Sequence, residues 1–98
     1  MQQMFAQAKK IERELKKAHA ELAEKEFVIK KAGIVEITLT GDKKVKTIKI
    51  EKDAITPANE EMIEDTLALA INEGLEAIKE ANDAIEEQIT GQKGSIGY

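Results

Sequence analysis

The sequence lacks several residue types, and each absence narrows what the protein can be. It contains no cysteine, so disulfide bonds and thiolate metal sites are excluded. No stretch approaches the ~20 apolar residues of a membrane-spanning helix, and no apolar run of the signal-peptide type opens the chain. We therefore expect a cytoplasmic protein. Aromatic residues make up only 3% of the chain, which predicts an aliphatic core and argues against a stacking platform for single-stranded nucleic acid.

Patterns that carry catalytic chemistry are also scarce. His19 is the only histidine, and no nucleophile stands near it in the sequence. There is no Gly-rich phosphate-binding pattern. The acids around residues 60–65 lack the spacing of a calcium loop and suit the start of a helix instead. We expect no enzymatic activity, no cofactor, no metal site and no small-molecule substrate.

The charge of the chain is divided unevenly between its halves. Residues 1–53 hold 13 basic and 9 acidic residues, and residues 54–98 hold 2 and 10, which accounts for the net charge of −4. Such a split can indicate a segment that binds a polyanion, although two ordinary surface helices can show it by chance. The length of 98 residues predicts one domain, residues 1–98.

The first segment, from about residue 2 to residue 24, predicts a helix with two distinct faces. Heptad spacing predicts a seam that packs on another helix, formed by Met4, Ala8, Ile11, Leu15, Ala18 and Leu22. Five basic residues fall opposite this seam and are called the basic ridge here: Lys9, Lys10, Arg13, Lys16 and Lys17. The pattern alone leaves two interpretations open, a solvated helix face or a footprint for a polyanion.

The middle of the chain predicts strands. Residues 35–40 and 45–51 alternate apolar and polar side chains, and Gly41-Asp42 between them predicts a hairpin. A further strand is expected at about residues 26–31, with Gly33 in the following turn. Four lysines surround the hairpin and either extend a basic surface or protect an edge strand: Lys43, Lys44, Lys46 and Lys49.

The last segment predicts a second, longer helix. Thr56 and Pro57 suit its start, and Gly91 suits its end. Its apolar stripe is broad and includes the packing residues Leu67, Ile71, Leu75, Ile78 and Ile85. Close helix approach explains Gly74 in its interior.

The length of this second helix predicts a partner. About 34 residues would span roughly 50 Å, whereas a compact domain of this size has a radius of gyration near 13 Å. The helix must overhang its own domain with an apolar stripe, and the simplest partner is a second copy in a symmetric homodimer. The Gly-rich tail, residues 91–98, is expected to be flexible.

Together these segments predict an α+β fold. The order is α-β-β-β-α, with a small antiparallel three-stranded sheet and two long projecting helices. The residues expected to pack in the core or the dimer are Met4, Ile11, Leu15, Leu22, Leu67, Ile71, Leu75, Ile78 and Ile85.

Three blocks of sequence, taken in this order and spacing, resemble the YbaB/EbfC family of bacterial nucleoid-associated proteins. They are MQQMFAQAKKIERELKKAHAELAEKE, VEITLTGDKKVKTIKI and IEDTLALAINEGLEAI, and a Gly-rich tail follows them. The resemblance implies a tweezer-like homodimer whose helical arms bind duplex DNA in the nucleoid. Family members often have a Gly-rich connection between the first two strands, whereas this chain has only KKAGI, and its tail is short.

The resemblance favours the polyanion interpretation of the basic ridge. Binding would rest on phosphate contacts, so it should depend strongly on salt and weakly on DNA sequence. The alternative is a protein-interaction or scaffold module whose DNA affinity is incidental. The negative net charge favours that alternative, whereas the position of the positive charge favours DNA.

Overall fold

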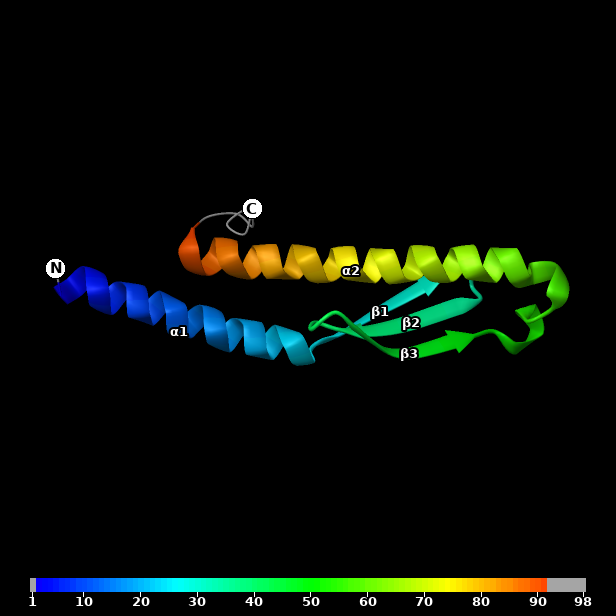
Figure 1. The fold of residues 1–98 in the computed structure, drawn as a ribbon, viewed down its shortest axis with the longest axis horizontal. Coiled ribbons are helices and arrows are strands. Elements are labelled where there is room, and N and C mark those ends of the chain that lie inside the picture. The colour runs from blue at the N-terminus through cyan, green and yellow to red at the C-terminus, as the bar shows by residue number, and fades with distance from the viewer. Residues whose placement is uncertain (1, 92–98) are drawn as a thin grey trace.

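The protein is an elongated α+β structure in the predicted order. The computed structural model describes residues 2–91, with side chains described from residue 7 onward. The elements in chain order are α1 (Gln2–Glu24), β1 (Glu26–Lys31), β2 (Val35–Thr40), β3 (Lys44–Ile50), the 3₁₀ turns η1 (Lys52–Ala54) and η2 (Pro57–Asn59), and α2 (Glu60–Thr90). Figure 1 shows α2 lying along the strands at one end and along α1 at the other. The α+β prediction is confirmed.

The three strands form one antiparallel sheet in the order β1-β2-β3. The first turn, residues 32–34, holds Ala32 and Gly33 at φ values of 56° and 69°, and the Ile34 amide donates a hydrogen bond to the carbonyl of Lys31 over 3.1 Å. The second turn places Lys43 at a φ of 67°. A register shift between β2 and β3 leaves Lys46 as the extra residue of a bulge. The hairpin at Gly41-Asp42 is confirmed, whereas the bulge has no signal in the sequence.

The core lies between α2 and one face of the sheet. Alternation along β2 sends Val35, Ile37 and Leu39 toward α2, where all three are buried. Gly74 lets the α2 backbone approach, because a Cβ atom there would collide with the side chain of Leu39. The close approach expected at this glycine is therefore an approach of helix to strand.

The helix α2 covers β1 and β2 but leaves much of β3 uncovered. Ile48 pairs with Ile37, so it projects from the face that carries α2. It is nevertheless 49% exposed, and its neighbour Val45 is 42% exposed. The strand β3 therefore presents aliphatic side chains to solvent on the same sheet face that α2 covers over β1 and β2.

The start of α2 differs from the prediction. Pro57 opens the short turn η2, and the α-helix begins at Glu60 after Asn59. The side-chain amide of Asn59 donates a hydrogen bond to the carbonyl of Ala54 over 2.9 Å, so it holds the preceding loop rather than capping the helix. The end is as predicted, because Gly91 adopts the left-handed conformation at a φ of 76°.

The molecule is far from spherical. It measures 67 × 22 × 16 Å, and its radius of gyration is 18.4 Å rather than the roughly 13 Å of a compact chain of this length. Its accessible surface is 7457 Å², whereas a compact protein of this mass exposes roughly 5,500 Å². The excess comes from the segments that extend beyond the sheet, which Figure 1 shows as α1 and the end of α2.

Candidate nucleic-acid interface

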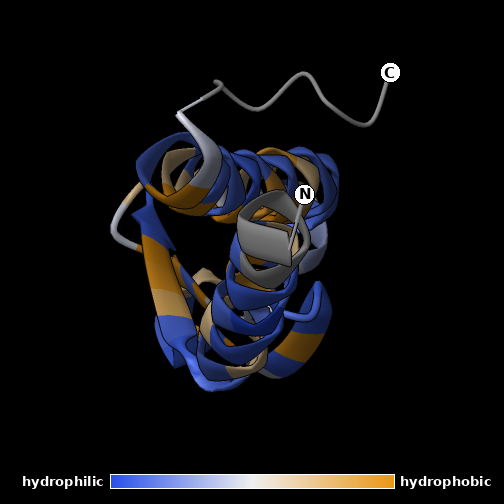
Figure 2. Cartoon of the chain, turned by 90° about the vertical axis from the view of Figure 1, so that its left-hand side faces the viewer, coloured by the Kyte–Doolittle hydropathy of each residue, from blue (hydrophilic) through white to orange (hydrophobic). Residues whose placement is uncertain are grey.

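The structure divides into a base and an arm. The base is defined here as the sheet with residues 60–79 of α2, and the arm as α1 with residues 80–90 of α2. Figure 2 looks along the molecule from the tip of the arm and shows α2 above both α1 and the strands, with the α1 ribbon mostly hydrophilic. All five residues of the basic ridge lie in this arm.

The basic ridge is exposed along its whole length. Every one of its members is exposed, and their spacing places them on one side of α1: Lys9, Lys10, Arg13, Lys16 and Lys17. The opposite side carries the seam, where Ile11, Leu15 and Ala18 are partly buried and Leu22 is buried. The same helix therefore turns its apolar stripe toward α2 and most of its positive charge away from α2, with Lys17 at the edge of the contact between the helices.

Small and aliphatic side chains join the two helices of the arm. Ala18 and Leu22 of α1 lie with Ala81 and Ile85 of α2 around one shallow hollow. Nearer the tip, Ala18 also lies close to Ile89. The helices run antiparallel and α2 ends at Thr90, so the first turns of α1 extend beyond the described part of α2.

The joint between arm and base is a close backbone contact. A Cβ atom on Gly41, in the β2–β3 turn, would collide with the backbone carbonyl of Leu22 near the end of α1. The Gly41 amide also donates a hydrogen bond to the carbonyl of Lys25 over 3.0 Å. Glycine is needed at this position for space, and the contact fixes the direction in which α1 leaves the sheet.

The remaining predicted packing residues lie along α2, except for one in α1. Ile78 is buried in the core, and Leu67, Ile71 and Leu75 are partly buried against it. Ile85 is partly buried in the arm. Met4 lies within α1, but its side chain is outside the described residues, as is the predicted flexible tail beyond Gly91.

The two sides of the molecule differ sharply in charge. The helix α2 holds ten acidic residues and one basic residue, Lys79, a net charge of −9. Lys79 forms an ion pair with Asp83 over 3.5 Å, and Lys31 of β1 reaches Glu73 of α2 over 2.6 Å. The α2 side is therefore strongly acidic, and the basic ridge lies on the opposite side of α1.

The sheet face that points away from α2 carries four lysines: Lys30, Lys44, Lys46 and Lys49. We call this surface the open sheet face. Sequence reasoning named Lys44, Lys46 and Lys49, but Lys30 was missed because its face depends on the strand pairing. The turn lysine Lys43 instead lines a mixed-charge hollow against α2.

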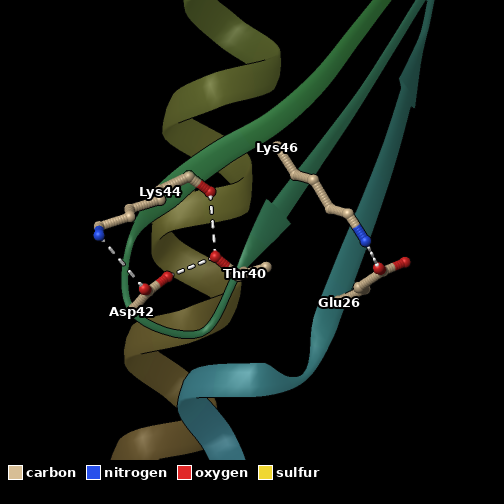
Figure 3. Close-up of polar contacts among 5 residues, drawn as sticks. All are labelled: Glu26, Thr40, Asp42, Lys44 and Lys46. Atoms are coloured by element: carbon tan, nitrogen blue, oxygen red, sulfur yellow. Dashed lines mark hydrogen bonds and ion pairs between the residues drawn. The ribbon is translucent and has the colours of Figure 1, made fainter.

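Polar contacts hold the hairpin end of this face, as Figure 3 shows. The Thr40 hydroxyl donates a hydrogen bond to the carboxylate of Asp42, and Lys44 lies 3.9 Å from that carboxylate. Lys46 forms an ion pair with Glu26 of β1, spanning the middle strand. The Thr40 hydrogen bond, assisted by the charge of Lys44, lowers the pKa of Asp42 below its usual value near 3.8. The carboxylate of Asp42 is therefore ionised at neutral pH.

Two other kinds of site, a metal-binding cluster and a membrane-spanning helix, are absent from the described part of the chain. Among them, no three histidine, cysteine, aspartate or glutamate residues are placed to hold a metal ion. No helix in residues 2–91 combines the length and apolar character needed to cross a membrane. His19 is partly buried at the side of the seam, and its Nε2 atom has no hydrogen-bond partner among the described residues.

A family model and two relatives of known sequence agree on the kind of protein that this chain resembles. The model of the YbaB/EbfC DNA-binding family matches residues 1–93. A nucleoid-associated protein of Lactobacillus acidophilus is 42% identical over 85 residues, covering 86% of this chain and 77% of the relative. One from Mycoplasmopsis pulmonis is 40% identical over 91 residues, covering 93% and 90%.

The fold has also been seen in a solved structure. An uncharacterized protein of Helicobacter pylori superposes with a TM-score of 0.78, covering 93% of this chain and 97% of that chain. At 16% identity this likeness shows the fold alone. The family match along nearly the whole chain and the relatives at about 40% identity show that this chain belongs to the YbaB/EbfC DNA-binding family.

Proposed function

We propose that this chain forms a homodimeric, nucleoid-associated protein that binds duplex DNA mostly through phosphate contacts from its helical arms. It would act in nucleoid organisation or gene expression, without catalysing a reaction. The observation that carries the proposal is the basic ridge, five exposed cations on one side of α1 with the acidic α2 on the other side. In a dimer two such ridges present ten positive groups to the DNA backbone.

Electrostatics supports a role for the ridge despite the negative net charge. Exposed charges further apart than about 10 Å are screened at moderate salt, so a phosphate senses mainly the nearest side chains. On the ridge side these are four lysines and an arginine, flanked by the exposed Glu12 and Glu14 of α1, whereas the ten acids of α2 lie on the other helix. Lysine and arginine on a smooth helix face contact phosphates without reading bases, which favours binding with little sequence preference.

The uncovered part of the sheet supports the homodimer. Val45 and Ile48 are exposed on the face that carries α2, and Ile55, which follows β3, is 59% exposed. Only six hydrophobic residues in the described part of the chain are buried, a small core for a chain of this length. A second copy can cover this edge through a symmetric interface, since both copies present the same aliphatic patch.

The test is DNA binding across a salt series. Fluorescence anisotropy would follow a duplex of about 30 base pairs binding to the wild type and to a variant that replaces four ridge residues with glutamine: Lys10, Arg13, Lys16 and Lys17. Each phosphate contact contributes about 0.9 to the log–log salt slope, so the variant should lose about 3.6 per engaged ridge. Light scattering must show that the variant stays dimeric.

A second function is favoured by one observation, the −9 charge of α2. Such a surface could dock a basic protein, with DNA affinity incidental. The same experiment distinguishes the DNA-binding function from the protein-docking function. If the ridge variant binds DNA as the wild type does, or if neither binds below about millimolar concentration, the ridge is a solvated helix face. The protein-interaction function is then the better hypothesis.

A further inference from the structure

The open sheet face lies on the same side of the molecule as the basic ridge. In the base, α2 covers the opposite face of the sheet through contacts such as Gly74 with Leu39. In the arm, α2 covers the seam side of α1, and Lys17, at the edge of the ridge, lines a hollow that α1 shares with α2. The helix α2 therefore covers one face of the sheet in the base and one side of α1 in the arm. Figure 2 shows α2 above both the strands and α1. The open sheet face and the ridge residues other than Lys17 therefore point away from α2.

The open sheet face carries an excess of positive charge. Its basic side chains are Lys30, Lys44, Lys46 and Lys49, and its acids are Glu26, Glu36 and, at the hairpin end, Asp42. Between them runs a smooth cross-strand row of Val28, Thr38 and Thr47. The face carries hydroxyl groups but no aromatic side chain on which a base could stack.

The ion pairs on this face leave its lysines available to an anion. The carboxylate of Glu36 lies 3.8 Å from Lys30 and 3.9 Å from Lys49, so one negative charge is shared between two positive ones. The side chains of these lysines are 76% and 74% exposed. Exposed pairs at such distances contribute little to stability, because water and salt screen them. A phosphate can compete for either lysine.

We propose that the open sheet face is a second phosphate-contacting surface that continues the basic ridge along one duplex. The proposal rests on the DNA-binding function proposed above. The path from Lys9 along α1 and β1 to Lys30 covers roughly 40 Å, given the rise per residue of a helix and a strand. This is about 12 base pairs of duplex, whereas the ridge alone spans about four. The acidic α2 would keep DNA off the other side.

The chain offers a matched set of lysines to test this proposal. Lys30 and Lys31 are neighbours in β1 on opposite faces of the sheet, and each forms an ion pair with a glutamate. The open-face variant is Lys30→Gln with Lys49→Gln. The control is Lys31→Gln with Lys79→Gln, which removes two lysines paired with acids of α2. Both variants change the net charge by the same amount, and anisotropy across a salt series would measure their binding.

The open-face variant should lose two phosphate contacts. Its salt slope should flatten by about 1.8, and its affinity near 0.15 M salt should fall roughly 30-fold. The control should keep the wild-type slope. Changing Lys30 and Lys49 to arginine instead should preserve binding, because the charge remains. Circular dichroism and light scattering would show that each variant is folded and has the wild-type oligomeric state.

Three results would overturn the proposal. If the open-face variant keeps the wild-type slope while the ridge variant loses binding, DNA contacts only the arm and the proposed function stands. If the control loses as much as the open-face variant, net charge rather than this surface governs affinity. A wild type that fails to bind duplex DNA would remove the proposed function and this inference together.

Discussion

The base and the arm use the same long helix in different ways. In the base, α2 is held against β2 by a close contact at Gly74 and by side chains such as Ile37 and Ile78 that are fully buried. In the arm, the same helix meets α1 through alanines and partly buried aliphatic residues around shallow hollows. The base therefore provides the stability of the fold, whereas the arm presents charge at a distance from it.

This division has a physical reason. A DNA backbone requires an extended row of positive groups, and such a row cannot be buried in a core. Under the function proposed above, the arm would meet this demand with exposed cations on a helix that needs little packing of its own, because its helix propensity is high. The cost is a large exposed surface, which the base alone must compensate within each chain. Stability and DNA affinity should thus respond to different substitutions.

The largest expected effect comes from a substitution that creates a cavity in the base. Ile37→Ala removes a side chain with no exposed surface, so it should cost roughly 4 kcal/mol in the free energy of unfolding. Leu15→Ala, at a partly buried position of the arm, should cost about 1 kcal/mol because water already reaches it. Urea denaturation followed by circular dichroism measures both. Equal losses would show that base and arm unfold as one equally packed body.

The joint gives the second test, since it connects the two regions. Gly41→Ala places a methyl group against the backbone carbonyl of Leu22, which must shift. We expect a loss of about 2 kcal/mol in stability, together with weaker DNA binding as α1 tilts. Gly33→Ala is the matched control, because its Cβ atom meets open space and only its positive φ is strained, costing about 1 kcal/mol. If both variants bind DNA equally well, the direction of α1 is not set by this joint.

Much of the fold could be predicted because local patterns agreed with one another. The alternation in β2 and the αL glycines at positions 33 and 91 are short-range signals, and each is found in the structure. The predicted start of α2 at Pro57 is wrong, since the α-helix begins at Glu60. The hydrogen bond from the Asn59 side chain to the Ala54 carbonyl holds the preceding loop, and helix propensity does not encode such a contact. The bulge at Lys46 likewise depends on how two strands meet.

The candidate site was predictable only in part for the same reason. Heptad spacing placed the basic ridge opposite the seam without any knowledge of α2. Finding Lys30 requires knowing which face of β1 is covered, and that is decided by the packing of α2 at Gly74, far along the chain. A residue's side in a strand follows from alternation, but whether that side faces solvent depends on long-range contacts.

A smaller test probes how closely α2 approaches the sheet. Gly74→Ala should improve helix propensity by about 1 kcal/mol and overpack the buried side chain of Leu39 by about 2 kcal/mol, leaving a net loss near 1 kcal/mol. Asn72→Ala, at an exposed position of the same helix, should gain stability because nothing opposes the improved propensity. Thermal unfolding compares the two. A stabilised Gly74→Ala protein would mean that the base packs no more tightly than the arm.

The smallest expected effect concerns pH at the turn beside the joint. The Thr40 hydrogen bond lowers the pKa of Asp42 below its usual value near 3.8, so the folded state favours the ionised carboxylate. The stabilisation is therefore present above that usual value and is lost as the pH falls through the lower folded value. Because Asp42 is exposed, the effect is small and is best seen as a difference between proteins. Melting temperatures of the wild type and Asp42→Asn should differ at neutral pH and converge as the pH falls through the lowered pKa of the folded state. A difference that stays constant with pH would assign the contribution of Asp42 to the shape of the turn rather than to its charge.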